Sequence, residues 1–123
     1  MNRKAEILPV ETKLSKSDYI RKVLEAYRRM PGATGTIRRN DRTLAATLFD
    51  RGVPLSAVEN ALVLAAARRI FRSPDAPQLQ PVRSLHYLLP VINEVLALFV
   101  SPDYFRYLQF KIDRALINKK QTL

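Results

Sequence analysis

The segment from Ser56 to Phe71, SAVENALVLAAARRIF, constrains the fold of this chain more than any other. Eleven of its sixteen residues are apolar, and they cover nearly every direction around a helix. A helix that is apolar all round lies inside a protein rather than on its surface. We therefore expect a buried central helix over 56–71. Ser56 and Glu59 match the S-x-x-E capping box, which predicts that this helix begins at Ser56.

Four further helices are predicted, over 14–30, 41–51, 84–99 and 101–118. In the first, Ile20, Val23, Leu24 and Tyr27 have the i, i+3, i+4, i+7 spacing of a buried helix face. The second follows the glycine-bearing segment PGATGTIRRND, the clearest loop of the chain, and we expect Asn40 to cap it. Gly52 then stands where a left-handed residue ends a helix.

Each of the two predicted C-terminal helices contains a proline, and the two prolines predict different effects on helix structure. Pro90 lies inside the apolar segment 84–99, which predicts either a kinked helix or two short helices. Pro102 follows Ser101, a favourable N-cap, and suits the first position of the last helix. The apolar spacing of that helix predicts that five residues are buried: Phe105, Leu108, Ile112, Ala115 and Leu116.

Together these patterns predict an all-α protein, a compact bundle of about five helices around the segment 56–71. Alternation with a period of two is nowhere sustained, so no sheet is expected. We expect one helical domain over 15–118, an N-terminal tail or arm over 1–14 and a frayed C-terminus over 119–123. The 123 residues are enough to bury a core without disulfides.

The charge indicates the class of partner. Twenty-one Lys and Arg against eleven Asp and Glu give a net charge of +10, a field that attracts polyanions. Nucleic acid is the partner we favour, with an anionic membrane surface or an acidic protein as competitors. No apolar run reaches the length of a membrane span, so no membrane is expected as a partner. The absence of cysteine favours a reducing, cytoplasmic compartment.

Residues 48–61, LFDRGVPLSAVENA, resemble a helix-turn-helix unit through Gly52, Val53 and Val58. Two features depart from that pattern. Leu48 stands where the close crossing of the helices usually requires alanine. The second helix would also offer a set of residues poorly suited to reading bases: Leu55, Ser56, Glu59, Asn60 and Val63. We favour a tight corner between two helices inside a bundle.

Arginines surround the loop Gly32-Ala-Thr-Gly35. Glycines and threonines in such a loop can bring backbone N–H groups and hydroxyls to a phosphate, which arginines then bind bidentately. The alternative is a loop whose arginines are solvated or paired with local acids. We predict one basic, nucleic-acid-binding surface formed by eight residues: Arg28, Arg29, Arg38, Arg39, Arg42, Arg68, Arg69 and Arg72.

A second candidate surface lies on the last helix. Tyr104, Tyr107, Lys111 and Arg114 share one face, and interleaved aromatic and basic groups suit stacking on unpaired bases. Equally, the two tyrosines can cover the edge of the core with their hydroxyls in water. The sequence leaves both interpretations open.

The residues do not suggest catalysis. His86 is the only histidine, cysteine is absent, and the acidic residues are scattered singly without the spacing of a metal site. We therefore expect no enzyme, cofactor or metal. The hypothesis is a non-catalytic module that binds the nucleic-acid backbone, DNA rather than RNA, as an accessory subunit of a larger nucleoprotein assembly. The alternative is a helical protein–protein adaptor or dimerisation domain with an incidental basic surface.

Overall fold

The computed structural model describes residues 14–98 and 100–121. The tail or arm predicted for 1–14 lies outside this range except for Leu14, which packs against the core. Within the described residues the protein is all-α, as predicted. Its elements are α3 (Lys16–Arg29), α4 (Arg39–Asp50), α5 (Leu55–Ile70), the 3-10 helix η1 (Leu85–Leu88), α6 (Leu89–Ala97) and α7 (Pro102–Gln121).

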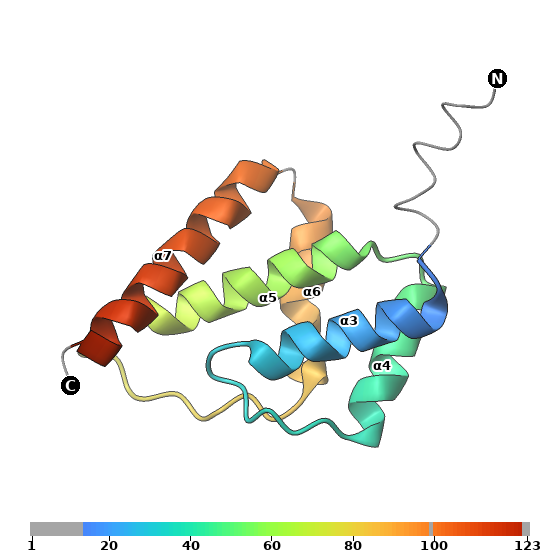
Figure 1. Cartoon of the computed structure of the whole chain (residues 1–123), viewed down its shortest axis with the longest axis horizontal. Helices are drawn as coiled ribbons and strands as arrows, with labels where there is room; N and C mark the ends of the chain where they lie inside the picture. The colour runs from blue at the N-terminus through green and yellow to red at the C-terminus, as the bar shows by residue number, and fades with distance from the viewer. Residues whose placement is uncertain (1–13, 99, 122–123) are drawn as a thin grey trace.

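Helix α5 is the centre of the bundle, as its apolar sequence predicted. It packs against α3, α6, α7 and η1, and Figure 1 shows it crossing the middle of the molecule between α3 and α7. Its exposed side chains are only Ser56, Glu59 and Arg68. Because neighbouring helices cover the rest, α5 has no free face with which to enter a DNA groove.

The predicted capping box of α5 is wrong. The helix begins at Leu55, Pro54 is its N-cap, and neither Ser56 nor Glu59 caps it. Pro54 has the extended backbone of a cap residue, and its carbonyl accepts the N–H groups of Ala57 and Val58 at 3.0 and 3.3 Å. No side chain forms a capping hydrogen bond at this end of α5.

The corner between α4 and α5 depends on Gly52. Its φ of +77° is left-handed, and its N–H donates to Phe49 O at 2.9 Å. The next amide, Val53 N–H, donates to Leu48 O at 3.0 Å, which completes a Schellman motif. On the N-terminal side of this motif, α4 packs on α3 and η1 rather than along α5. The segment 48–61 is therefore a corner.

Helix α4 does not begin where Asn40 predicted. It begins at Arg39 with Arg38 as the N-cap, so both its start and its cap lie two residues earlier than predicted. The side chain that fixes this end is Asp41, whose contacts are given below. At the start of α3 the cap is a side chain, since Ser15 Oγ accepts the N–H of Asp18 at 3.1 Å.

The connector between α5 and η1, residues 71–84, has irregular structure, and it is fixed to the glycine loop. Thr34 N–H donates to Val82 O at 2.9 Å and Val82 N–H donates to Gly32 O at 2.7 Å. Ala33 and Val82 thereby form an isolated bridge. This attachment holds the loop after α3 beside the connector, as Figure 1 shows.

Pro90 separates two short helices, one of the two predicted outcomes. η1 ends at Leu88 and α6 begins at Leu89, so Pro90 lies in the first turn of α6. Amides of a first helical turn have no intrahelical acceptor, and the missing N–H of proline therefore costs nothing there.

Helix α7 begins as predicted, with Ser101 Oγ accepting the N–H of Asp103 at 3.1 Å. Phe105, Leu108 and Ile112 are buried. The burial predicted for Leu116 is wrong because its side chain is 36% exposed, and Ala115 is only half-buried. The helix continues to Gln121, beyond the fraying expected after Asn118.

Two tyrosines of α3 provide a test of the packing. Both are buried, but Tyr19 donates its hydroxyl proton to Val53 O at 2.7 Å, whereas the Tyr27 hydroxyl has no protein partner among the described residues. Tyr19→Phe should lower the free energy of unfolding by about 1 kcal/mol. Tyr27→Phe, the matched change, should leave it unchanged or raise it. Urea unfolding measures both, and a greater loss for Tyr27→Phe would contradict this packing.

The Tyr19 hydroxyl also predicts a pH dependence. Burial raises the pKa of Tyr19 from 10.0 to about 12. The unfolded chain therefore loses this proton first as the pH rises, and the contribution of Tyr19 to stability is complete below pH 10. Between pH 10 and about 12 the free energy of unfolding should fall more steeply for the wild type than for Tyr19→Phe. Parallel curves would contradict the assignment.

Candidate nucleic-acid interface

The geometry of the basic region begins with Asp41, whose side chain is 1% exposed. One carboxylate oxygen accepts the N–H of Arg38 at 2.9 Å, and the other accepts the N–H of Leu85 at 2.9 Å. The first bond closes the start of α4, and the second attaches it to η1, 44 residues further along the chain. Asp41 is therefore fully used inside the protein, although the sequence offers it as a partner for the surrounding arginines.

Five arginines border the loop between α3 and α4, and all five are exposed. We call them the loop-flanking arginines: Arg28, Arg29, Arg38, Arg39 and Arg42. None of them forms an ion pair with an acidic side chain in the described residues. Of the acids on α3 and α4, Asp18 pairs with Arg21 and Asp50 with Lys16, and Glu25 forms no ion pair with these arginines in the described residues. The loop-flanking arginines therefore carry charges that no side-chain ion pair among the described residues neutralises.

Three of these arginines lie at the start of α4, with Arg38 as N-cap and Arg39 and Arg42 in the first turn. The N-terminus of a helix carries a partial positive charge and favours anions. Cations at this end therefore oppose the helix dipole, and the only acid of the turn, Asp41, is buried. Such a placement destabilises the free protein and creates a strongly anion-attracting surface.

Tyr27 connects the end of α3 to this surface. Burial raises the pKa of Tyr27, the negative charge of Asp41 raises it further, and the positive charge of Arg38 lowers it. Both charges therefore act at the same buried hydroxyl. Helices α3 and α4 pack against each other, and the loop-flanking arginines lie at the end of α3 and the start of α4.

The loop itself offers fewer amides to a phosphate than its glycines suggested. Ala33 N–H donates to Met30 O at 3.1 Å, and Thr34 N–H is used in the bridge to the connector. Gly32 has a different role. Gly32 has a φ of +93°, and a Cβ at this position would lie 2.6 Å from Arg69 Nε. Gly32 therefore allows the close approach of Arg69.

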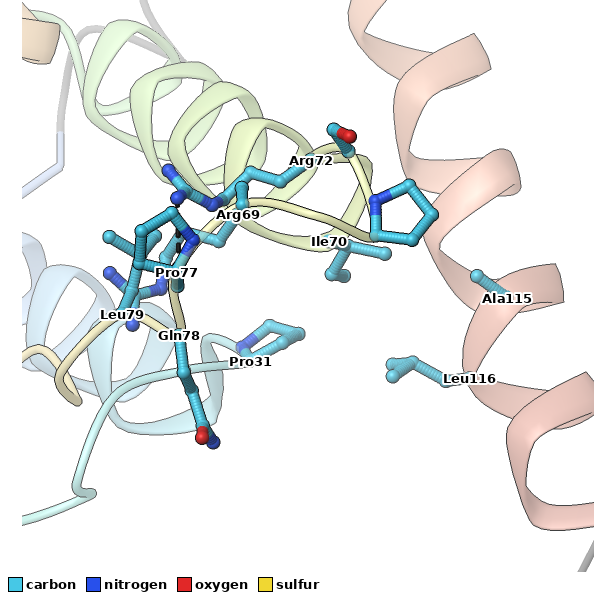
Figure 2. A pocket seen from close by; sticks show the side chains of 13 residues that line it. Pro31, Arg69, Ile70, Arg72, Pro77, Gln78, Leu79, Ala115 and Leu116 are labelled. Carbon is cyan, nitrogen blue, oxygen red and sulfur yellow. Dashed lines mark hydrogen bonds between the residues drawn. The ribbon is translucent and has the colours of Figure 1, made fainter.

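Arg69 and Arg72 bind the connector. Arg69 Nη2 donates to Gln80 O at 2.6 Å, and Arg72 Nη2 donates to Pro77 O at 2.9 Å. Figure 2 shows both on the connector side of a groove of about 730 Å³, opposite Ala115 and Leu116 of α7. Their hydrogen bonds explain how a connector without regular structure is held on the bundle.

Arg68 differs from the other predicted arginines. It forms a bidentate ion pair with Glu94 of α6, with N–O distances of 2.9 and 2.5 Å. These hydrogen bonds hold the pKa of Glu94 below its ordinary value. The charge of Arg68 is thus compensated, and the side chain connects α5 to α6. Of the eight arginines predicted to form one surface, Arg68, Arg69 and Arg72 are thus bound to groups within the protein, and the loop-flanking five are exposed.

The predicted aromatic and basic face of α7 is exposed. Tyr104 and Tyr107 are 45% and 54% exposed, so they do not belong to the core. Lys111 Nζ lies 5.8 Å from the ring centre of Tyr107, and Arg114 is exposed one turn further along. This face therefore has the composition that the sequence predicted.

Two further aromatic residues belong to this region and were missed from the sequence. Lys111 Nζ lies 5.4 Å from the ring centre of Phe71, and the guanidinium of Arg114 lies 5.5 Å from that of Phe110. The sequence pattern predicts Phe71 inside the buried central helix, whereas it is the C-cap of α5 and is 46% exposed. The spacing of Phe110, three residues after Tyr107 and four before Arg114, was a signal that could have identified it.

In the described part of the chain, no three His, Cys, Asp or Glu side chains come together as metal ligands do. No described helix is both long and apolar enough to cross a membrane. Comparisons with protein-family models, with curated proteins and with solved structures find no match to this chain.

The position of the loop-flanking arginines should depend on Asp41. Asp41→Ala leaves the N–H groups of Arg38 and Leu85 without their acceptor, and should lower the free energy of unfolding by roughly 2–4 kcal/mol. Urea unfolding checks this, with the exposed acid Asp113 changed to alanine as the control. A loss no larger than that of Asp113→Ala would show that the two hydrogen bonds do not determine this end of α4.

Proposed function

We propose that the protein is a non-catalytic nucleic-acid-binding module that contacts mainly the phosphate backbone through the loop-flanking arginines. The observation that carries this proposal is the group of three arginines at the start of α4, where the helix dipole already favours an anion and Asp41 is buried. A phosphate bound there would relieve the repulsion between these cations. Each arginine can also donate two parallel hydrogen bonds to its oxygens.

Backbone contacts are favoured over base reading. The helix that a helix-turn-helix protein would place in the groove is covered by α3, α6 and α7. Exposed arginines on loops and helix ends suit phosphates, which position a protein without specifying a sequence. Duplex DNA is the first polymer to test, with RNA second. In this proposal the chain is a cytoplasmic accessory subunit of a larger nucleoprotein assembly.

A second candidate function is a protein–protein adaptor or a homodimer. The observation that favours it is the group of exposed apolar side chains at the end of α6 and before α7, which consists of Leu96, Leu98 and Val100. Exposed apolar surface of this kind can mark a protein-binding site. An interface of this kind should respond weakly to salt, whereas binding through Z phosphates of a duplex weakens with a log–log slope of about −0.9Z.

Changing Arg38 and Arg39 to alanine together tests the proposal. The double variant should lose roughly 1–3 kcal/mol of binding free energy for a short duplex, the usual worth of charge-assisted contacts. The salt slope should fall by about two units if each arginine meets one phosphate. Fluorescence anisotropy over a series of salt concentrations measures both, and thermal unfolding should be nearly unchanged because both side chains are exposed.

The matched control is Arg51→Ala with Arg106→Ala, which removes the same charge from exposed positions at the end of α4 and on α7. A general effect of net charge would weaken both double variants equally. Equal binding by the Arg38 and Arg39 variant and the wild type, on duplex and single strand at low salt, would refute the site. If the wild type bound neither polymer, the adaptor function would replace this proposal.

A further inference from the structure

A cleft of about 320 Å³ lies between the end of α5 and the C-terminal half of α7. It is lined by Phe71, Phe110, Lys111, Arg114, Ala115 and Asn118. This volume falls in the range of about 300–1,000 Å³ that is usual for small-molecule sites. The loop-flanking arginines do not line it, so it is separate from the surface proposed above.

The walls of the cleft are aromatic and largely exposed. Phe71 and Phe110 are 46% and 56% exposed, although burying a phenylalanine side chain is worth about 1.5–3 kcal/mol. Phe71 is the C-cap of α5, the residue at which that helix ends. Two half-exposed phenyl rings at the same cleft provide flat apolar surface for a planar ligand.

Cations are held at these rings. Lys111 Nζ lies 5.4 Å from the ring centre of Phe71, and the Arg114 guanidinium lies 5.5 Å from that of Phe110. Both distances are within the range of cation–π attraction. Neither Lys111 nor Arg114 forms an ion pair within the described residues. Their charges are thus available to an anion at the edge of the cleft, and Asn118 adds amide donors and an acceptor.

We propose that this cleft binds an unpaired nucleotide of a single-stranded nucleic acid. The base stacks on Phe71 or Phe110, Lys111 and Arg114 bind the flanking phosphates, and Asn118 faces the edge of the base. Tyr107 extends the aromatic surface along α7 for a neighbouring base, since Lys111 also contacts its ring. This assignment rests on the proposed function, and it specifies that the cleft beside α7 binds the single-stranded form of the nucleic acid.

The charges argue for this occupant over a second copy of the chain. A symmetric dimer through the cleft would bring two sets of Lys111 and Arg114 together, because the same residues contribute from both copies. Juxtaposed like charges oppose such an interface. A polyanion with planar apolar bases instead complements both the cations and the rings.

The test compares three ligands: a fluorescein-labelled single strand, a strand of equal phosphate number with abasic sites in place of its bases, and the labelled strand annealed to its complement as a duplex. Changing Phe71 and Phe110 together to alanine should weaken single-strand binding roughly 5- to 150-fold, the worth of stacking one base. The variant should leave duplex affinity unchanged. The wild type should bind the abasic strand as weakly as the variant binds the normal strand.

Salt separates stacking from charge. The Phe71 and Phe110 variant should keep the salt slope of the wild type on single strand, because no phosphate contact is removed. Changing Lys111 and Arg114 to alanine should reduce the slope by about 1.4 units, given about 0.7 per phosphate on single strands. Tyr87→Ala is the control for loss of an exposed aromatic ring, since Tyr87 is 61% exposed on η1, and it should bind like the wild type.

The outcomes distinguish this inference from the proposed function. If the Phe71 and Phe110 variant bound single strand as tightly as the wild type, the inference that the cleft binds a nucleotide would be wrong. The proposed function would still hold if changing Arg38 and Arg39 weakened duplex binding. A wild type that bound neither polymer would overturn both. If the variant lost self-association in sedimentation but kept its single-strand affinity, the cleft would belong to a second copy and the inference would be wrong.

Discussion

The buried carboxylate of Asp41 holds together segments that are distant in the chain. It accepts the N–H of Arg38 at the start of α4 and the N–H of Leu85 at the start of η1. The chain between these two points forms α4, the Gly52 corner, α5 and the connector. The Asp41 side chain therefore joins the start of this segment to its end. Since Asp41 makes its bonds inside the protein, the arginines beside it are left exposed and unpaired in the described residues.

The fold class and the central helix could be predicted because their signals are local. An all-round apolar segment identified α5, and the caps at Ser15 and Ser101 needed only neighbouring residues. The starts of α4 and α5 could not be predicted in this way. Asn40 and Ser56 are favourable caps by residue type, but a contact 44 residues away and the backbone of Pro54 determined the helix ends.

In the candidate site, too, local features could be predicted from the sequence and long-range contacts could not. Exposure of the loop-flanking arginines follows from their positions on polar helix faces and could be predicted. The pairing of Arg68 with Glu94 could not, because the acid lies 26 residues away and meets it only once α6 packs on α5. Phe71 is a similar case: its apolar character predicted burial, but the end of α5 leaves it half-exposed beside Lys111.

A backbone amide and arginine Nε–H titration by ¹H–¹⁵N NMR tests most directly whether the start of α4 binds nucleic acid. A short duplex DNA added at low salt should shift the side-chain signals of Arg38, Arg39 and Arg42 and the amides around them, in proportion to the duplex bound. Signals of α6 should stay in place. Shifts confined to α6 or to the end of α4 at Asp50, with the three arginine signals unmoved at saturation, would contradict this account.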